Sequence, residues 1–109
     1  MIDDRIELRR YRTAGGHVPY SEWLADLNDA TAGRVSAYVD RMKSGNFGHS
    51  RPIGQSVSEL KINFGPGYRV YYLRDGHMIV VLLCGGDKGS QRADIRWARE
   101  YAVDYWRRG

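Results

Sequence analysis

The sequence contains a single cysteine, only three prolines and no long apolar run. The lone Cys84 excludes an internal disulfide, which is typical of proteins from a reducing compartment, and its place at the end of an apolar strand favours an inert buried thiol. Without a membrane-spanning run or a signal peptide, the protein is expected to be cytoplasmic, with no membrane contact. The three histidines, His17, His49 and His77, have no metal-ligand spacing among themselves or with Cys84, so neither a metal site nor a cofactor is expected.

The 109 residues are enough for one hydrophobic core, so residues 1–109 are interpreted as a single domain. The formal net charge is +4 and the isoelectric point is about 9.4. An excess of cations suits a polyanionic partner such as nucleic acid, or an acidic protein.

The stretch 58–88 carries the clearest pattern in the chain. Apolar and polar residues alternate from Leu60 to Phe64, which is the period of a half-buried strand. The Gly65-Pro66-Gly67 turn separates this strand from an aromatic and β-branched run at 68–74. Asp75-Gly76, a strong hairpin signal, separates that run from a third strand at 77–84.

Turn lengths predict which side chains share a face of the sheet. A two-residue turn at Asp75-Gly76 pairs Arg74 with His77, and a three-residue turn at 65–67 pairs Phe64 with Tyr68. Directly opposed residues point to the same side. One face is therefore apolar and should be covered by helices: Leu60, Ile62, Phe64, Tyr68, Val70, Tyr72, Ile79, Val81 and Leu83. The other face carries Lys61, Asn63, Arg69 and Tyr71 beside Val80 and Leu82.

The remaining segments complete an α+β order. IELRRY predicts a short first strand, the stretch from Pro19 to Leu27 a helix, and a second helix capped by Asn28 or Asp29 should stop at Gly45. Residues 46–57 are expected to be an irregular linker, and a last helix should cover about 91–106. The predicted fold is β-α-α-β-β-β-α, with a mostly antiparallel sheet and an N-terminal helical hairpin packed on its apolar face.

The motifs ELKINFGPGYRVYY and VVLLCGGDKGSQRADI, with WLADLND and SGNFG before them, resemble a known family over essentially the whole chain. They are similar to the RelE/ParE superfamily of toxins from type II toxin-antitoxin systems. The similarity is strongest to the HigB-like branch, also called addiction-module killer proteins.

The resemblance implies a RelE-like fold with two helices on one face of the sheet and a concave site on the other. It implies a metal-independent endoribonuclease that cleaves mRNA, typically in the ribosome, and thereby inhibits translation and arrests growth. The implied partner is a cognate antitoxin, usually a helix-turn-helix DNA-binding protein in HigB-like systems. A toxin–antitoxin heterotetramer is one assembly that the resemblance allows.

The resemblance also implies catalytic positions. Lys61 matches one of two strand lysines, Arg69 matches the arginine of the GYR motif, and Lys88 lies near the cation that follows the last strand. Asn63 replaces the second lysine, and Asp94 stands where a tyrosine is expected. Both departures leave the proton-transfer roles open.

RNA cleavage without a metal needs a base for the ribose 2′-hydroxyl, cations for the phosphorane and an acid for the leaving 5′-oxygen. The planar fork of Arg69 suits a phosphate, and fixed cations near developing charge contribute strongly to catalysis. Lys61 or Lys88 could serve as base or acid, with Asp94 as an alternative base. Alternatively, Lys61 has no catalytic role, and its charge only prevents aggregation through an exposed edge of the sheet.

Further residues are candidates for substrate binding beside Asn63. Tyr71 could stack on a base, although aromatic strand residues are more often simply packed. His49 and Arg51 could contact the phosphate backbone or remain solvated. Arg92 begins a row with Arg96 and Arg99 that is either a solvated helix face or an RNA contact.

Two other functions remain open. The ParE branch of the same superfamily inhibits DNA gyrase without enzymatic activity, and fold alone cannot separate the two activities. A catalytically inactive member that only binds antitoxin is the second alternative. The set Lys61, Arg69 and Lys88 favours the nuclease, whereas the missing second lysine and tyrosine favour the gyrase inhibitor.

Overall fold

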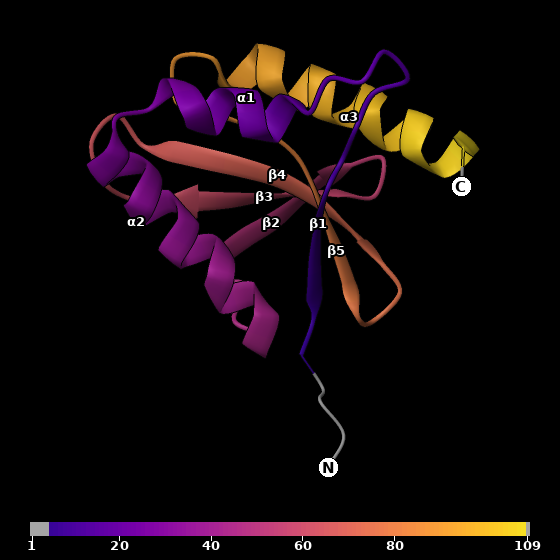
Figure 1. Ribbon diagram of the computed structural model, residues 1–109, viewed down its shortest axis with the longest axis horizontal. Coiled ribbons are helices and arrows are strands. Elements are labelled where there is room, and N and C mark those ends of the chain that lie inside the picture. The colour runs from indigo at the N-terminus through magenta and orange to yellow at the C-terminus, as the bar shows by residue number, and fades with distance from the viewer. Residues whose placement is uncertain (1–4, 109) are drawn as a thin grey trace.

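The computed structural model describes residues 5–108 and has an α+β fold with one five-stranded sheet and three α-helices (Figure 1). The strand at the N-terminus precedes two helices, and the other four strands precede the long C-terminal helix. The elements are β1 (Glu7–Arg10), α1 (Pro19–Asp26), α2 (Asp29–Asp40), a 3₁₀ turn (Arg41–Ser44), β2 (His49–Gly54), β3 (Val57–Ile62), β4 (Tyr68–Asp75), β5 (Ile79–Asp87) and α3 (Gln91–Arg108).

The sheet has the strand order β1-β5-β4-β3-β2. β1 runs parallel to β5, while the other three neighbouring pairs are antiparallel. The sheet is therefore mixed but mostly antiparallel, as predicted. Its last four strands follow one another as a meander, because each connection is a short turn.

The predicted helix ends follow the capping residues. The Asn28 side chain accepts a hydrogen bond from the backbone N–H of Thr31 at 2.9 Å, so Asn28 caps α2. Gly45 closes the 3₁₀ turn with a φ of 86°, a left-handed conformation that glycine adopts without steric cost.

The sheet is covered on both faces. Buried residues from α1, α2 and the 3₁₀ turn pack with Leu60, Ile62 and Val70 on one face. On the other face, Ala98 and Ala102 of α3 pack against Tyr71 and neighbouring strand residues. The expected open face opposite the two N-terminal helices is therefore only partly open, because α3 lies across it.

The prediction of an irregular linker at 46–57 is wrong for most of its length, because His49–Gly54 forms β2 at the edge of the sheet. Pro52 argued against a strand, yet proline is tolerated on an edge strand, where its missing N–H breaks no ladder. The predicted order consequently lacked one strand.

The predicted β4–β5 register is also wrong. Asp75 pairs with Ile79 and Tyr72 with Leu82 rather than Ile79, so the turn is one residue longer than expected. The resulting odd shift in register reverses the sides of residues 79–83. Val80 and Leu82 thus face α1 and α2, whereas Ile79, Val81 and Leu83 lie on the α3 side. The β3–β4 loop is two residues longer than expected, and this even shift preserves the predicted faces of both strands.

The N-terminal helices do not form the predicted hairpin. α1 packs mainly on β5 and makes few contacts with α2. Each helix instead contributes separately to the core on the same face of the sheet. Within residues 5–108, no helix is long and apolar enough to cross a membrane.

Candidate active site

Two rows of side chains cross the α3 side of the sheet from β2 to β4. In the first row His49 pairs with Lys61, and Lys61 pairs with Arg69. In the second row Arg51 pairs with Glu59, and Glu59 pairs with Tyr71. Directly opposed residues share a face, so β2 brings an imidazole and a guanidinium next to the predicted cations of β3 and β4.

Glu59 is the centre of a buried hydrogen-bond network. Its Oε1 accepts from Nε of Arg51 at 3.0 Å. Its Oε2 accepts from the hydroxyl of Tyr71 and from Nε2 of Gln91, both at 2.9 Å. Only 3% of the Glu59 side chain is exposed. A buried carboxylate needs such partners, because burial of an unpaired charge is costly.

The network keeps Glu59 ionised. Burial raises the pKa of Glu59, but the hydrogen bonds from Gln91, Tyr71 and Arg51 outweigh this effect and hold its pKa below the ordinary value. Burial, followed by the hydrogen bond to Glu59, raises the pKa of Tyr71. Tyr71 therefore stays protonated as the donor and Glu59 stays charged as the acceptor.

Arg69 is a buried cation with an uncommitted donor. Its Nη1 donates to the backbone oxygen of Gly67 at 2.8 Å, and 7% of its side chain is exposed. Its Nε lies 3.9 Å from Oε2 of Glu59 and has no hydrogen-bond partner among residues 5–108. An unsatisfied buried donor costs about 1–3 kcal/mol. The arrangement thus leaves one guanidinium donor of a cleft residue unsatisfied, although the Nε atom is itself buried.

These residues line a cleft of about 430 Å³ that opens between β2, β3, β4 and the start of α3. The side chains of Lys61 and His49 make no hydrogen bond or ion pair with other residues of the described chain. The cleft therefore presents cationic side chains to a polyanion. Beneath them lies the Glu59 carboxylate, which pairs with Arg51 and attracts Arg69. The lining consists of His49, Ser50, Arg51, Glu59, Lys61, Arg69 and Gln91.

The structure brings four predicted site residues together and places the others outside this lining. Lys61, Arg69, His49 and Arg51 lie in the cleft. Asn63 is exposed just after β3, Lys88 is exposed in the turn before α3, and Arg92 is exposed on α3. Tyr71 is fully buried, which does not fit its predicted stacking on a base. Its hydroxyl supports Glu59 instead.

Asp94 lies in the first turn of α3 and accepts a hydrogen bond from the Ser90 hydroxyl. Its carboxylate packs on β5, where a Cβ added to Gly86 would lie 1.8 Å from Oδ2. Burial raises the pKa of Asp94. The contacts of Asp94 fasten the start of α3 to β5, while its predicted role as a base stays a prediction.

Sequence reasoning missed Glu59 and Gln91. Glu59 looked like one polar residue in an alternating strand, although it shares the polar side of β3 with Lys61. A carboxylate beside Lys61 and opposite Tyr71 was the available signal. Gln91 gave none, because its contact with Glu59 depends on how α3 packs across the sheet.

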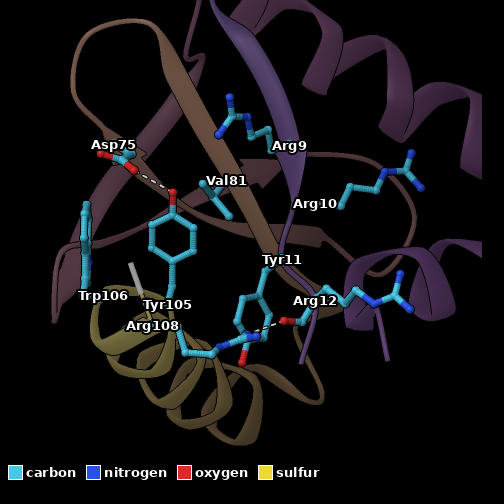
Figure 2. A pocket seen from close by; sticks show the side chains of 9 residues that line it. All are labelled: Arg9, Arg10, Tyr11, Arg12, Asp75, Val81, Tyr105, Trp106 and Arg108. Carbon is cyan, nitrogen blue, oxygen red and sulfur yellow. Dashed lines mark hydrogen bonds between the residues drawn. The ribbon is translucent and has the colours of Figure 1, made fainter. Parts of the chain in front are cut away.

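A larger hollow, of about 580 Å³, lies between β1 and the C-terminal half of α3 (Figure 2). It is rich in arginine, but most of these cations already have partners. Arg9 pairs with Glu7, Arg10 donates to Ser21 at 2.8 Å, and Arg108 pairs with Asp104. The smaller cleft, with its unpaired Arg69 donor, is therefore the better candidate active site.

Residues 22–100 match the family model described as Phage derived protein Gp49-like (DUF891). The chain belongs to this Gp49-like family. The family is part of the RelE/HigB-like toxin superfamily, and its members are often toxins of toxin-antitoxin systems. The matched residues include every residue that lines the cleft.

A relative of this Gp49-like chain occurs in Haemophilus influenzae (strain ATCC 51907 / DSM 11121 / KW20 / Rd), where it is described as an uncharacterized protein. The two sequences are 38% identical over 86 residues, which cover 78% of this chain and 87% of the relative. The relative therefore supports the family but supplies no activity.

Proposed function

We propose that this Gp49-like protein is the HigB-like toxin of a type II toxin-antitoxin module and acts as a metal-independent endoribonuclease on mRNA at the ribosome. The observation that carries the proposal is the buried Arg69 guanidinium, whose Nε is unpaired at a cleft that also holds Lys61 and His49. A phosphodiester supplies the oxygens that these donors lack.

Cleavage would proceed by attack of the ribose 2′-oxygen on phosphorus. The new O2′–P bond forms as the P–O5′ bond breaks, which gives a 2′,3′-cyclic phosphate and a 5′-hydroxyl. Arg69 would bind the phosphate oxygens and stabilise the charge that develops on them, while Glu59 holds Arg51 and Arg69 in place. Fixed donors of this kind contribute about 3–4 kcal/mol each to transition-state stabilisation.

Proton transfer would fall to His49 and Lys61. The His49 side chain lines the cleft and makes no hydrogen bond or ion pair with residues 5–108, so its ring nitrogens are free to contact a substrate. His49 would accept the 2′ proton, and the Lys61 ammonium would protonate the leaving 5′-oxygen. Lys88 and Asp94 remain candidates that must approach from outside the cleft lining.

The chemistry of the RNA ends tests this proposal directly. Purified protein should be incubated with mRNA, in the presence and absence of translating ribosomes, and the new ends should be treated with polynucleotide kinase. We expect 5′-hydroxyl ends that accept phosphate. Intact RNA under both conditions, together with inhibition of DNA gyrase in a supercoiling assay, would instead assign the protein to the ParE-like mode.

The proposed partners are a cognate antitoxin with a helix-turn-helix domain, mRNA and the ribosome. Co-expression tests the first of them. A small helix-turn-helix protein encoded beside this chain should restore growth and co-purify with it. Normal growth of cells that produce this chain alone would favour the catalytically inactive alternative.

A further inference from the structure

A second cationic surface lies along α3, next to the turn between β2 and β3. One hollow of about 540 Å³ is lined by Arg92, Arg96 and Arg99, and another of about 410 Å³ by Arg96, Arg99 and Arg107. Because the two hollows share Arg96 and Arg99, they form one groove. We call it the α3 groove. Its polar lining is Arg92, Arg96, Arg99, Arg107, Gln55, Ser90, Glu100 and Asp104, so four arginines outnumber two carboxylates.

Most cations of the α3 groove are free to bind a ligand. The side chains of Arg92, Arg96 and Arg107 are exposed and make no hydrogen bond or ion pair within residues 5–108, although Arg107 lies close enough to Asp104 to interact with it electrostatically. Arg99 differs, because its Nε donates to the backbone oxygen of Ile53 at 2.8 Å. Arg99 thereby attaches α3 to β2. The other three guanidiniums lie on either side of Arg99 along the helix.

The α3 groove adjoins the candidate active site. Arg92 follows Gln91, which lines the cleft, and Ile53 lies on β2 two residues after Arg51, which also lines it. From Arg92 to Arg107 the helix rises about 22 Å. Residues at this spacing recur near one side of a helix, so the arginines continue the cationic surface away from the cleft.

The backbone at the edge of the α3 groove is strained. Gln55 and Ser56 form the two-residue turn between β2 and β3, with φ values of 55° and 64°. Such turns favour Asn-Gly, because residues with a Cβ rarely adopt positive φ. Strain of this kind persists mainly at functional sites. Here it places the Gln55 side chain in the lining of the groove.

We propose that the α3 groove binds the phosphate backbone of single-stranded RNA that flanks the cleaved bond. This inference rests on the proposed function and extends its substrate contact beyond one phosphodiester. A row of four guanidiniums fits a regularly charged polymer, because it exceeds the charge of the two carboxylates in the lining and because one of these, Asp104, is already paired with Arg108. Protein interfaces, in contrast, centre on a buried aromatic or aliphatic anchor, and the groove offers only half-buried Ile95 and Val103.

Fluorescence anisotropy with labelled single-stranded RNA of about 16 nucleotides tests the inference. The triple variant Arg92→Gln/Arg96→Gln/Arg107→Gln is compared with Arg34→Gln/Arg41→Gln/Lys43→Gln, which removes the same charge from α2 and the adjoining 3₁₀ turn. Each triple variant lowers the net charge of +4 by three, so bulk electrostatics are matched. Thermal unfolding confirms that both variants remain folded.

The α3 variant is expected to bind the RNA about tenfold or more weakly, and its plot of log affinity against log salt should lose about 2 units of slope. In the control variant, the loss of RNA affinity and the loss of salt-dependence slope should each be less than half as large. Equal behaviour of the two triple variants, or no RNA binding by the unmodified protein, would overturn the inference.

Failure of the proposed function gives a different result. If Arg69→Gln leaves toxicity intact while the α3 variant still loses RNA affinity, the nuclease assignment fails and the groove remains. If RNA cleavage is confirmed and both triple variants bind alike, only the groove assignment fails. A control with acidic polyglutamate distinguishes RNA from acidic protein, because binding of this polymer as tight as that of RNA would also overturn the inference.

Discussion

The Nε atom of Arg69 lies 3.9 Å from Oε2 of Glu59, close enough for electrostatic attraction but too far for a hydrogen bond. The carboxylate is already saturated on that side by Tyr71 and Gln91. Glu59 therefore offsets the charge of Arg69 without occupying its donor. A phosphate that binds this donor would break no existing hydrogen bond, but the buried Nε would first have to become accessible from the cleft.

Arg69→Lys tests whether the shape of the guanidinium matters. Lysine keeps the charge but loses the planar fork, so we expect cleavage to fall by about 10²–10³-fold, nearly as far as in Arg69→Gln. Initial rates of RNA cleavage at saturating substrate provide the measurement. If Arg69→Lys keeps most of the activity, a point charge is sufficient and bidentate phosphate binding is wrong.

Glu59→Gln should reduce stability in a pH-dependent manner. The folded pKa of Glu59 lies below its ordinary value of 4.5, so its ionised form stabilises the fold above that value and this contribution disappears as the pH falls through the folded pKa. Loss of the buried charge should cost about 3 kcal/mol at neutral pH.

Urea unfolding of the unmodified protein and Glu59→Gln, measured from neutral to acidic pH, provides the test. Their difference in unfolding free energy should be largest at neutral pH and shrink below about pH 4.5. The other carboxylates titrate in both proteins and cancel in the difference. A gap that stays constant over this range would contradict an ionised Glu59.

Gly86→Ala should loosen the attachment of α3 to β5. The added Cβ would lie 1.8 Å from Oδ2 of Asp94 and 2.7 Å from Oγ of Ser90, so these groups must move. We expect a loss of about 1–3 kcal/mol in unfolding free energy. Gly33→Ala in α2 is the matched control, since nothing lies within 4 Å of its Cβ, and it should add about 0.5–1 kcal/mol. Equal effects would show that Asp94 does not pack as described.

Cys84 should be unreactive in the folded protein. Burial, assisted by the charge of Asp94, raises the pKa of Cys84 to about 12, so the thiol is protonated at neutral pH, and only 7% of the residue is exposed. An aromatic disulfide reagent should label it only as fast as the chain unfolds. Labelling at the rate of a free thiol in native buffer would contradict this description.

Predictability from the sequence differed between elements for physical reasons. The faces of β3 and β4 were correct because an error of two residues in loop length preserves side-chain parity. β5 was reversed because its turn differs by one residue. β2 was missed because proline and glycine punctuate it, although an edge strand tolerates both.

The same reasons limit what the sequence revealed of the candidate site. Lys61 and Arg69 could be placed on one face from local alternation and the resemblance. The contributions of His49 and Arg51 depend on the missed strand, and that of Gln91 depends on the packing of α3 across the sheet. Glu59 was visible in the sequence, but its importance comes from three long-range partners.

The most direct test of the nuclease assignment is transcriptome-wide mapping of RNA 5′ ends after brief induction of the unmodified chain, Lys61→Ala, Arg69→Ala and Lys88→Ala, each without antitoxin. We expect new ends within coding regions for the unmodified chain. These ends and growth inhibition should be largely lost in Lys61→Ala and Arg69→Ala, with a smaller loss in Lys88→Ala, which lies outside the cleft lining. Growth arrest with intact transcripts, or full toxicity and cleavage in all three variants, would contradict the proposal.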